Sequence, residues 1–162
     1  MLEQVGQQLH VDDAILHYPV SGGEIDGGVI SADIYVDAPV EATVPDHHAC
    51  RMAKRYLDMI NSKDLSEIPA LFEDDAVHLG GLATRLRGPD EITAFFVDKI
   101  VPMDVKVVPV AFGGSGDDCL VSIAVERMVG GERRFALTVV DHVTIGASGK
   151  IKRLVAFMRP GD

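Results

Sequence analysis

The chain has no tryptophan, only two cysteines, and 6% aromatic residues among its 162 residues. No apolar run approaches the roughly 20 residues of a membrane-spanning helix. The first residues, MLEQVGQQLHVDD, lack the basic and apolar segments of a secretory signal. Cys50 and Cys119 lie far apart and show no metal or redox spacing. These absences predict a cytoplasmic protein with reduced, structural thiols and no metal site.

Positive charge is also scarce. The sequence has 15 Lys and Arg against 25 Asp and Glu, which gives a formal net charge of -10 at pH 7. Because nucleic-acid backbones and anionic membranes are polyanions, this imbalance argues against both as partners. The glycine-rich stretches lack a P-loop or dinucleotide signature, so neither nucleotide binding nor any other cofactor is expected. A hydrophobic small molecule is the favoured ligand.

Apolar residues, by contrast, are abundant. They make up 47% of the chain, enough for one good core but in a chain too short for two comfortable domains. Residues 1–45 differ from the rest because they contain SGG and DGG, with one alternating run at 29–36 that could form a strand. We interpret 1–45 as an N-terminal extension of uncertain order and 46–160 as the folded domain.

Helical spacing of apolar residues dominates the first half of that domain. It predicts a helix that starts near Asp46, with Asp46 as its N-cap, and that points Tyr56 inward. Residues 65–72 read as a second short helix and 90–100 as a third. Between them, 76–79 reads as a short strand that ends at a Gly-Gly break.

The pattern changes to alternation beyond Pro102. Four strand-like segments follow, separated by glycine-containing turns: 105–112, 119–129, 132–145 and 150–158. Helices followed by a four-stranded antiparallel meander predict an α+β layout, with the helices on one face of a curved sheet.

The most informative polar residue is Asp141, which interrupts an apolar strand face. Its companions at alternate positions, which a strand points the same way, are Phe135, Leu137, Val139, Val143 and Ile145. Burying a lone carboxylate there is costly unless it is paired or protonated, so its pKa should be raised and it becomes a functional candidate. Alternatively the face is exposed, or Asp141 pairs with an arginine. Arg127 alternates in phase with the predicted cavity face, whereas Glu126 is expected in solvent.

Three segments, in order, resemble ketosteroid isomerase and its nuclear transport factor 2-like, polyketide cyclase-like relatives: RYLDMINSKDLSEIPALFEDDAVHL, LRGPDEITAFF and VVDHVTIGASGKI. The resemblance covers about residues 48–158. It implies a cone-shaped α+β barrel, in which a strongly curved antiparallel sheet is wrapped by about three helices around an apolar pocket, and a homodimer. Because this fold also hosts dehydratases, epoxide hydrolases and binding domains, it does not fix the activity.

The resemblance also suggests site residues. In ketosteroid isomerase a tyrosine and a protonated aspartic acid donate hydrogen bonds to a dienolate oxygen, and their positions match Tyr56 and Asp141. The family's base, a carboxylate, falls on Gly80. His78 on the same strand could replace it, since the ordinary histidine pKa suits a base. Ionised Asp141 could itself act as the base, or an acid of the extension could: Asp12, Asp13, Asp26 or Asp37.

The sequence therefore predicts proton-transfer chemistry, either double-bond isomerisation or cyclisation, on a hydrophobic carbonyl compound such as a steroid or polyketide. The alternatives are a dehydratase or epoxide hydrolase that uses Asp141 and His78 as base and acid, and a non-catalytic binding module. The residues expected to line the pocket are Ile60, Phe72, Gly80, Phe96, Ile123, Val125, Leu137, Val139, Leu154 and Met158. Asp46, His47, His48 and Cys50 form a DHH-x-C cluster that is not expected to hold a metal.

Overall fold

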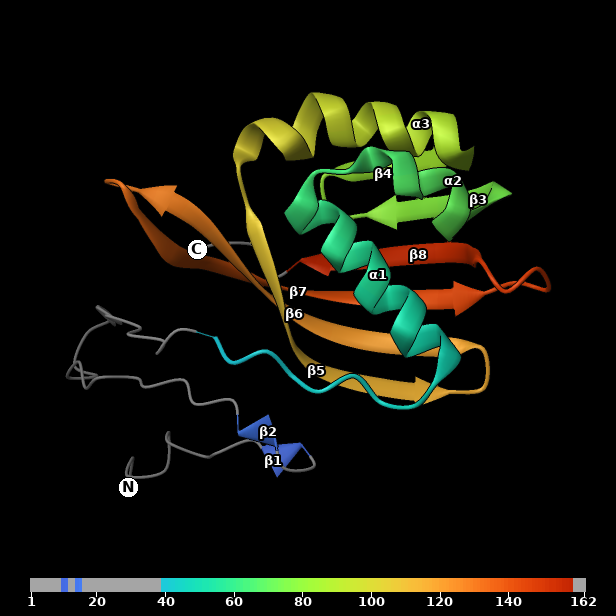
Figure 1. Cartoon of the computed structure of the whole chain (residues 1–162), viewed down its shortest axis with the longest axis horizontal. Coiled ribbons are helices and arrows are strands. Elements are labelled where there is room, and N and C mark those ends of the chain that lie inside the picture. The colour runs from blue at the N-terminus through green and yellow to red at the C-terminus, as the bar shows by residue number, and fades with distance from the viewer. Residues whose placement is uncertain (1–9, 12–13, 16–38, 159–162) are drawn as a thin grey trace, which may run out of the picture. The chain divides into compact units, whose positions relative to one another are not determined.

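The structure is a computed structural model that describes residues 10–11, 14–15 and 39–158 (Figure 1). Contacts divide the chain into two compact units, Met1–Pro39 and Val40–Asp162. In the first unit, β1 (His10–Val11) and β2 (Ala14–Ile15) pair in antiparallel fashion. The expected strand at 29–36 lies outside the described residues, as do the aspartates considered as replacement acids: Asp12, Asp13, Asp26 and Asp37.

The second unit is built on a six-stranded sheet in the order β4-β3-β8-β7-β6-β5. The strands are β3 (Phe72–Gly80), β4 (Ala83–Arg87), β5 (Lys106–Ser115), β6 (Asp118–Val129), β7 (Glu132–Ile145) and β8 (Ile151–Met158). The predicted meander is confirmed as β5 to β8. The expectation of a wholly antiparallel sheet is wrong, because β3 joins the last strand of the meander in the same direction and makes β3–β8 a parallel pair. The sheet is mixed and open.

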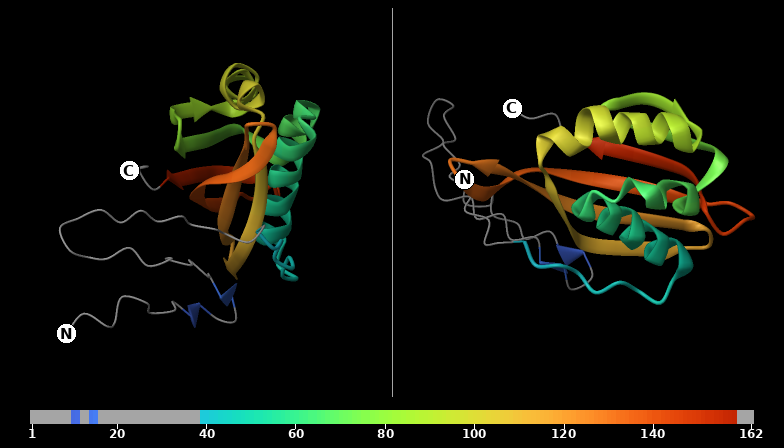
Figure 2. Two further views of the ribbon diagram at one scale, coloured as in Figure 1. Left: turned by 90° about the vertical axis from the view of Figure 1, so that its left-hand side faces the viewer. Right: turned by 45° about the horizontal axis from the view of Figure 1, so that its top comes forward.

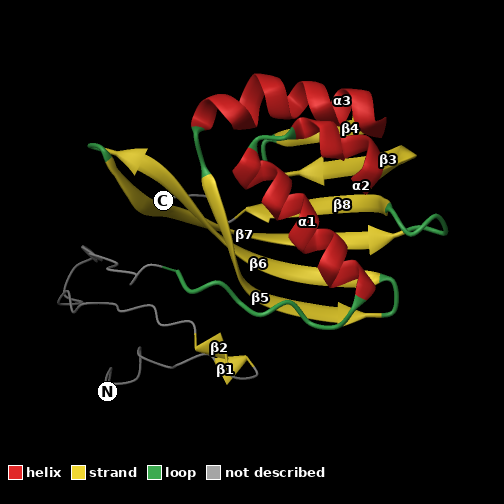
Figure 3. Cartoon of the chain, viewed as in Figure 1, coloured by secondary structure: helices red, strands yellow, loops and turns green. Residues whose placement is uncertain are grey.

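Three helices accompany this sheet, as predicted: α1 (His48–Ser62), the short α2 (Ile68–Leu71) and α3 (Gly88–Phe95). A short turn, η1 (Leu65–Glu67), precedes α2. After α3 the chain continues through a short π-helix, η2 (Phe96–Ile100), and a 3₁₀ turn, η3 (Val101–Met103). Figures 2 and 3 show α1 lying across one face of the sheet, with α3 beside the β3–β4 edge. The α+β class is confirmed.

Helix α1 forms because its apolar residues recur on one face and bury against the sheet. It ends at Ser62, and its C-cap, Lys63, has a φ of 59° in the left-handed region. Its N-cap is His47, and no side chain caps the helix. The expected cap, Asp46, is therefore wrong; this carboxylate forms an ion pair with Arg51 at 2.5 Å instead.

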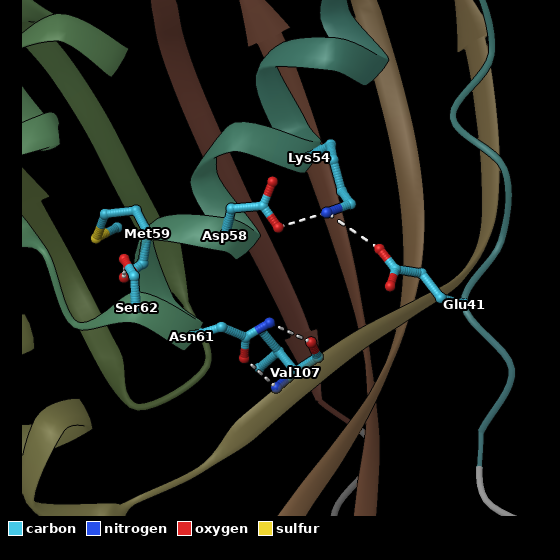
Figure 4. A network of polar contacts seen from close by, with 7 residues as sticks. All are labelled: Glu41, Lys54, Asp58, Met59, Asn61, Ser62 and Val107. Carbon is cyan, nitrogen blue, oxygen red and sulfur yellow. Dashed lines mark hydrogen bonds and ion pairs between the residues drawn. The ribbon is translucent and has the colours of Figure 1, made fainter.

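The polar side of α1 is anchored to neighbouring segments (Figure 4). The Asn61 side chain donates to the Val107 carbonyl and accepts from the Val107 N–H, both at 2.8 Å. Lys54 pairs with Asp58 on the same helix and with Glu41 at 3.0 Å. These contacts fix α1 against edge strand β5 and the segment that precedes the helix, and so fix the side chains on its inner face.

The core lies between the helices and the sheet face that they cover. Its largest fully buried side chains are Leu57, Ile68, Leu71, Phe72, Ile92, Phe96, Ile151 and Leu154. They come from α1, α2, α3, η2, β3 and β8, so burial joins all the layers of the unit. None of the helices in this part of the chain is both long enough and apolar enough to cross a membrane.

The ladder between β6 and β7 is interrupted by a bulge. Val125 pairs with Leu137, but the next residue, Glu126, pairs with Phe135. The alternation expected from Phe135 to Ile145 therefore breaks at this point. Glu126 is 8% exposed, with Lys106 Nζ 3.6 Å from its carboxylate, whereas Arg127 is exposed. The expectations of a solvated Glu126 and a cavity-facing Arg127 are wrong.

Candidate functional site

A pocket of about 120 Å³ opens between the helices and the inner face of the sheet. Its wall is almost wholly apolar, and the polar side chains in it are Tyr56, His78 and Asp141. Leu82 and Met103 belong to the wall although they are 55% and 47% exposed, so they mark the open rim. The three polar groups of the sequence prediction thus meet in one apolar space.

Eight of the ten residues expected to line the pocket do so: Ile60, Gly80, Phe96, Ile123, Val125, Leu137, Val139 and Met158. Phe72 and Leu154 are fully buried and lie outside the lining. The Phe72 ring packs edge-on against Tyr56 at 5.9 Å, so it supports the tyrosine instead of meeting a ligand. Leu154 pairs with His78 in the ladder.

Sequence reasoning missed several wall residues: Leu57, Gly81, Leu82, Phe95, Ile100, Met103, Val105, Val107 and Ala156. A signal was available for Ala156, which alternates with Leu154 and Met158 on one strand. None was available for Leu82, because the chain after Gly81 reads as a loop. It in fact turns into β4, which pairs with β3.

Tyr56 is held on the inner face of α1 by two aromatic neighbours. Its ring lies edge-on to Phe72 at 5.9 Å and to Phe96 at 6.0 Å. Burial, and then the negative charge of Asp141, raise the pKa of the Tyr56 phenol well above its usual value. The hydroxyl therefore stays protonated at neutral pH and is available as a hydrogen-bond donor.

Asp141 lies in the middle of β7, paired with Val121 on one side and Ala156 on the other. It is 4% exposed, and its Oδ1 has no hydrogen-bond partner among the described residues. Burial raises the pKa of the Asp141 carboxyl to about 7. Near neutral pH this group therefore exists in both protonation states, and either state would meet a ligand in the pocket.

His78 lies on β3 with its ring 5.8 Å from that of Phe95. Burial lowers the pKa of His78 to about 4, so the imidazole is neutral at pH 7. Its Nδ1 is buried without a hydrogen-bond partner in the described part of the chain. Because an unpaired buried acceptor is tolerated better than an unpaired N–H, we place the proton on Nε2.

At Gly80, where the resemblance to ketosteroid isomerase leads us to expect a carboxylate, the backbone leaves no room for a side chain. Its φ is +80°, and an added Cβ would lie 2.2 Å from the carbonyl oxygen of Ala156. The β3–β4 register also shifts between Leu79 and Gly80. An aspartate side chain at position 80 would therefore collide with the Ala156 carbonyl group.

The other candidate groups are dispersed. Within residues 39–158, no three His, Cys, Asp or Glu side chains are placed to hold a metal ion. In the DHH-x-C cluster, Asp46 pairs with Arg51, and His48 Nε2 lies 2.8 Å from the Gly149 carbonyl oxygen. Cys50 and Cys119 are free and buried. The chemistry of the described chain therefore concentrates in the apolar pocket.

Comparisons with known proteins agree with this fold. No functionally curated protein matches the chain. A candidate polyketide cyclase from Sinorhizobium meliloti is 24% identical with a TM-score of 0.56, over 66% of this chain and 94% of that one. A candidate ketosteroid isomerase from Kribbella flavida is 22% identical with a TM-score of 0.59, over 71% and 80%. These structures share the fold.

A Mycobacterium tuberculosis protein solved with estradiol-17β-hemisuccinate is 15% identical with a TM-score of 0.61, over 71% of this chain and 96% of that one. The SnoaL-like domain family matches residues 53–154, which is more than half of the chain and includes Tyr56, His78 and Asp141. This chain belongs to the SnoaL-like domain family, within the nuclear transport factor 2-like superfamily.

Proposed function

We propose that this protein catalyses proton transfer at the carbon next to the carbonyl group of a hydrophobic compound. Asp141 carries the proton, and the Tyr56 hydroxyl donates a hydrogen bond to the carbonyl oxygen. The observation that carries the proposal is a buried carboxyl with a pKa of about 7 that shares an apolar pocket with a protonated phenol. A general base works best when its pKa lies near the working pH.

Neither position 80 nor His78 offers a better base than Asp141. Gly80 has no room for a side chain beside the Ala156 carbonyl. The pKa of His78, lowered to about 4 by burial, makes this imidazole a poor base, and it is unprotonated and so no acid at neutral pH. This argues against a dehydratase or epoxide hydrolase in which His78 supplies the proton.

In the proposed step, the Asp141 carboxylate takes a proton from the carbon beside the carbonyl. The electron pair of the broken C–H bond forms a carbon–carbon double bond, and the negative charge moves to the oxygen. The Tyr56 hydroxyl stabilises that oxygen in a site almost free of competing polar groups. The protonated Asp141 then returns the proton to another carbon, which completes an isomerisation. Alternatively, the new carbanion attacks a second carbonyl, Asp141 protonates the resulting oxygen, and the product is cyclic.

Below the pKa of Asp141 the site has a different character. The carboxyl is then neutral, and with Tyr56 it forms a pair of donors suited to an oxyanion, with no base beside them. This state favours the second candidate function, a non-catalytic binding module for oxygen-bearing hydrophobic ligands. The estradiol derivative bound to the mycobacterial neighbour supports ligands of this kind.

Hydrogen–deuterium exchange of β-tetralone in D₂O tests the proposal, because exchange at the carbon beside the carbonyl reports proton removal whatever the natural product is. Wild-type protein should accelerate exchange increasingly as pH rises through about 7. Asp141→Asn should lower the rate by about a hundredfold or more. His78→Gln should leave it nearly unchanged. A wild-type rate that falls with pH, or equal rates in wild type and Asp141→Asn, would exclude Asp141 as the base.

The homodimer suggested by the resemblance stays a prediction. Leu120 and Phe157 point to the outer face of the sheet, opposite Asp141, and are 51% and 56% exposed. Exposed apolar side chains of this size on one sheet face are compatible with a second copy of the chain. Sedimentation of wild type and of a Phe157→Asp variant would test it.

A further inference from the structure

We propose that Ala156 sets the width of ligand that the pocket accepts, because it forms the floor of a trough running from Asp141 to Gly80. The trough would hold a flat, apolar part of the ligand, such as a fused ring. This inference rests on the proposed function only for the ligand's oxygen, which the Tyr56 hydroxyl would hold. Ala156 would thus determine specificity without making a polar contact with the ligand.

The strand register places the trough. Asp141 on β7 pairs with Ala156 on β8, and Ala156 pairs with Gly80 on β3. These three residues form one row across the sheet, and all three line the pocket. Neighbouring strands lie about 4.8 Å apart, so the row extends about 10 Å from the Asp141 backbone to that of Gly80. This length suits two fused rings lying flat.

The trough exists because Ala156 and Gly80 are small, whereas the residues in the rows beside them carry bulky side chains. Along β8, Ala156 is flanked on the same face by Leu154 and Met158. Along β7, Val139 and Val143 take the corresponding places beside Asp141. Met158 and Val139 line the pocket on one side of the row, and His78, which pairs with the buried Leu154, lines it on the other. A ligand part that lies over Ala156 therefore has larger side chains on both sides, and a larger side chain at position 156 would fill the space.

The far end of the trough is fixed by the backbone. The Gly81 N–H donates to the Ala156 carbonyl at 3.0 Å, and the same oxygen excludes a Cβ at Gly80. No side chain at position 80 can therefore enter the trough. Beyond it stands Leu82 at the exposed rim, so a longer ligand would leave the pocket on this side.

The test compares phenol with β-naphthol, which adds one ring, in wild type, Ala156→Leu and Ala147→Leu. Ala147 lies in the exposed β7–β8 turn, so it receives the same substitution outside the pocket. Wild type should bind β-naphthol about tenfold more tightly than phenol, from the extra apolar area buried. Ala156→Leu should lose this preference and keep its affinity for phenol within about threefold. Ala147→Leu should behave as wild type.

A second variant, Ala156→Val, adds less volume with a side chain that suits a strand. Its preference for β-naphthol should lie between those of wild type and Ala156→Leu. The inference is overturned if Ala156→Leu keeps the full preference, or if it weakens both probes equally.

Naphthalene separates this inference from the proposed function, because it has no oxygen for Tyr56 or Asp141 to bind. If wild type binds naphthalene and Ala156→Leu does not, the trough is supported even where phenol binding fails and the proposed oxygen site is lost. If both proteins bind naphthalene equally, or neither binds it, the trough is excluded.

Discussion

A β-carbon on Gly80 would lie 2.2 Å from the carbonyl oxygen of Ala156 on the neighbouring parallel strand. The two backbones approach so closely because Gly80 adopts a φ of +80°, which other residues rarely adopt. The position at which the resemblance predicted a base is therefore occupied by a close contact between two strands. The proton transfer that we propose therefore has to depend on other groups in the pocket wall.

This contact predicts the effect of adding a methyl group. Gly80→Ala should destabilise the protein by more than Gly131→Ala, because Gly131 has a φ of +85° but no atom within 4 Å of an added Cβ. The left-handed backbone alone should cost about 1–2 kcal/mol in both variants, and the steric overlap adds to this only at Gly80. Urea unfolding gives the comparison; equal losses of stability would contradict it. Gly80→Asp should likewise lose stability without gaining activity.

Asp141 predicts a pH dependence of stability. Its pKa in the folded protein is raised by burial from 3.8 to about 7, so folding is penalised by an increasing amount as pH rises from 4 to 7 and fully above 7. Asp141→Asn abolishes this penalty. The stability of the variant relative to wild type should therefore be about 2–3 kcal/mol more favourable at pH 8 than at pH 5. Denaturant unfolding at both pH values measures it, and a pH-independent difference would show that the carboxyl titrates normally.

Titration of His78 should make stability depend on pH with the opposite sign, so that it falls as pH falls. Because burial lowers its pKa from 6.5 to about 4, its contribution disfavours the folded state progressively below pH 6.5. As pH falls from 7 to 4.5, the free energy of unfolding of His78→Gln should rise by about 2 kcal/mol relative to that of wild type. His48→Gln, at the exposed start of α1, is the matched control. NMR of the imidazole should show His78 neutral at pH 6; a protonated ring at that pH would refute the prediction.

Removing the Tyr56 hydroxyl should slow the proposed reaction without unfolding the protein. Tyr56→Phe keeps the ring that packs against Phe72 and Phe96 and removes only the hydroxyl. Deuterium exchange of β-tetralone should slow by about 10²–10³-fold, as when one donor to a developing oxyanion is removed. The thermal midpoint should change little. A variant with the exchange rate of wild type would mean that another group binds the carbonyl oxygen.

The helix count, the α+β class and the β5–β8 meander could be predicted because periodicity is a local property. A 3.6-residue period placed Tyr56 on the inner face of α1, and alternation placed Asp141 beside Val139 and Val143. The burial of both residues follows from those patterns. The raised pKa of Asp141 follows as well, since it needs only apolar neighbours.

Other parts of the site depend on contacts between segments far apart in the sequence. Alternation alone could not reveal the bulge at Ala136 on β7, since a bulge inserts a residue without changing the residue types around it. Nor could it show that Glu126 is buried, because burial at this position depends on contacts with other segments. Nor could the residues near Gly80 show that β3 pairs with β8, which begins about seventy residues later in the sequence.

The sequence by itself determined which faces of α1 and β7 are buried, and therefore that a phenol and a carboxyl point into the same apolar interior. Only the tertiary structure decided that Ala156 lies between Asp141 and Gly80, that Gly80 excludes a side chain, and that burial makes His78 a weak base. The physical reason is the range of the interactions. Side-chain direction follows from local backbone geometry, whereas strand neighbours, close backbone approaches and desolvation depend on which distant segments meet.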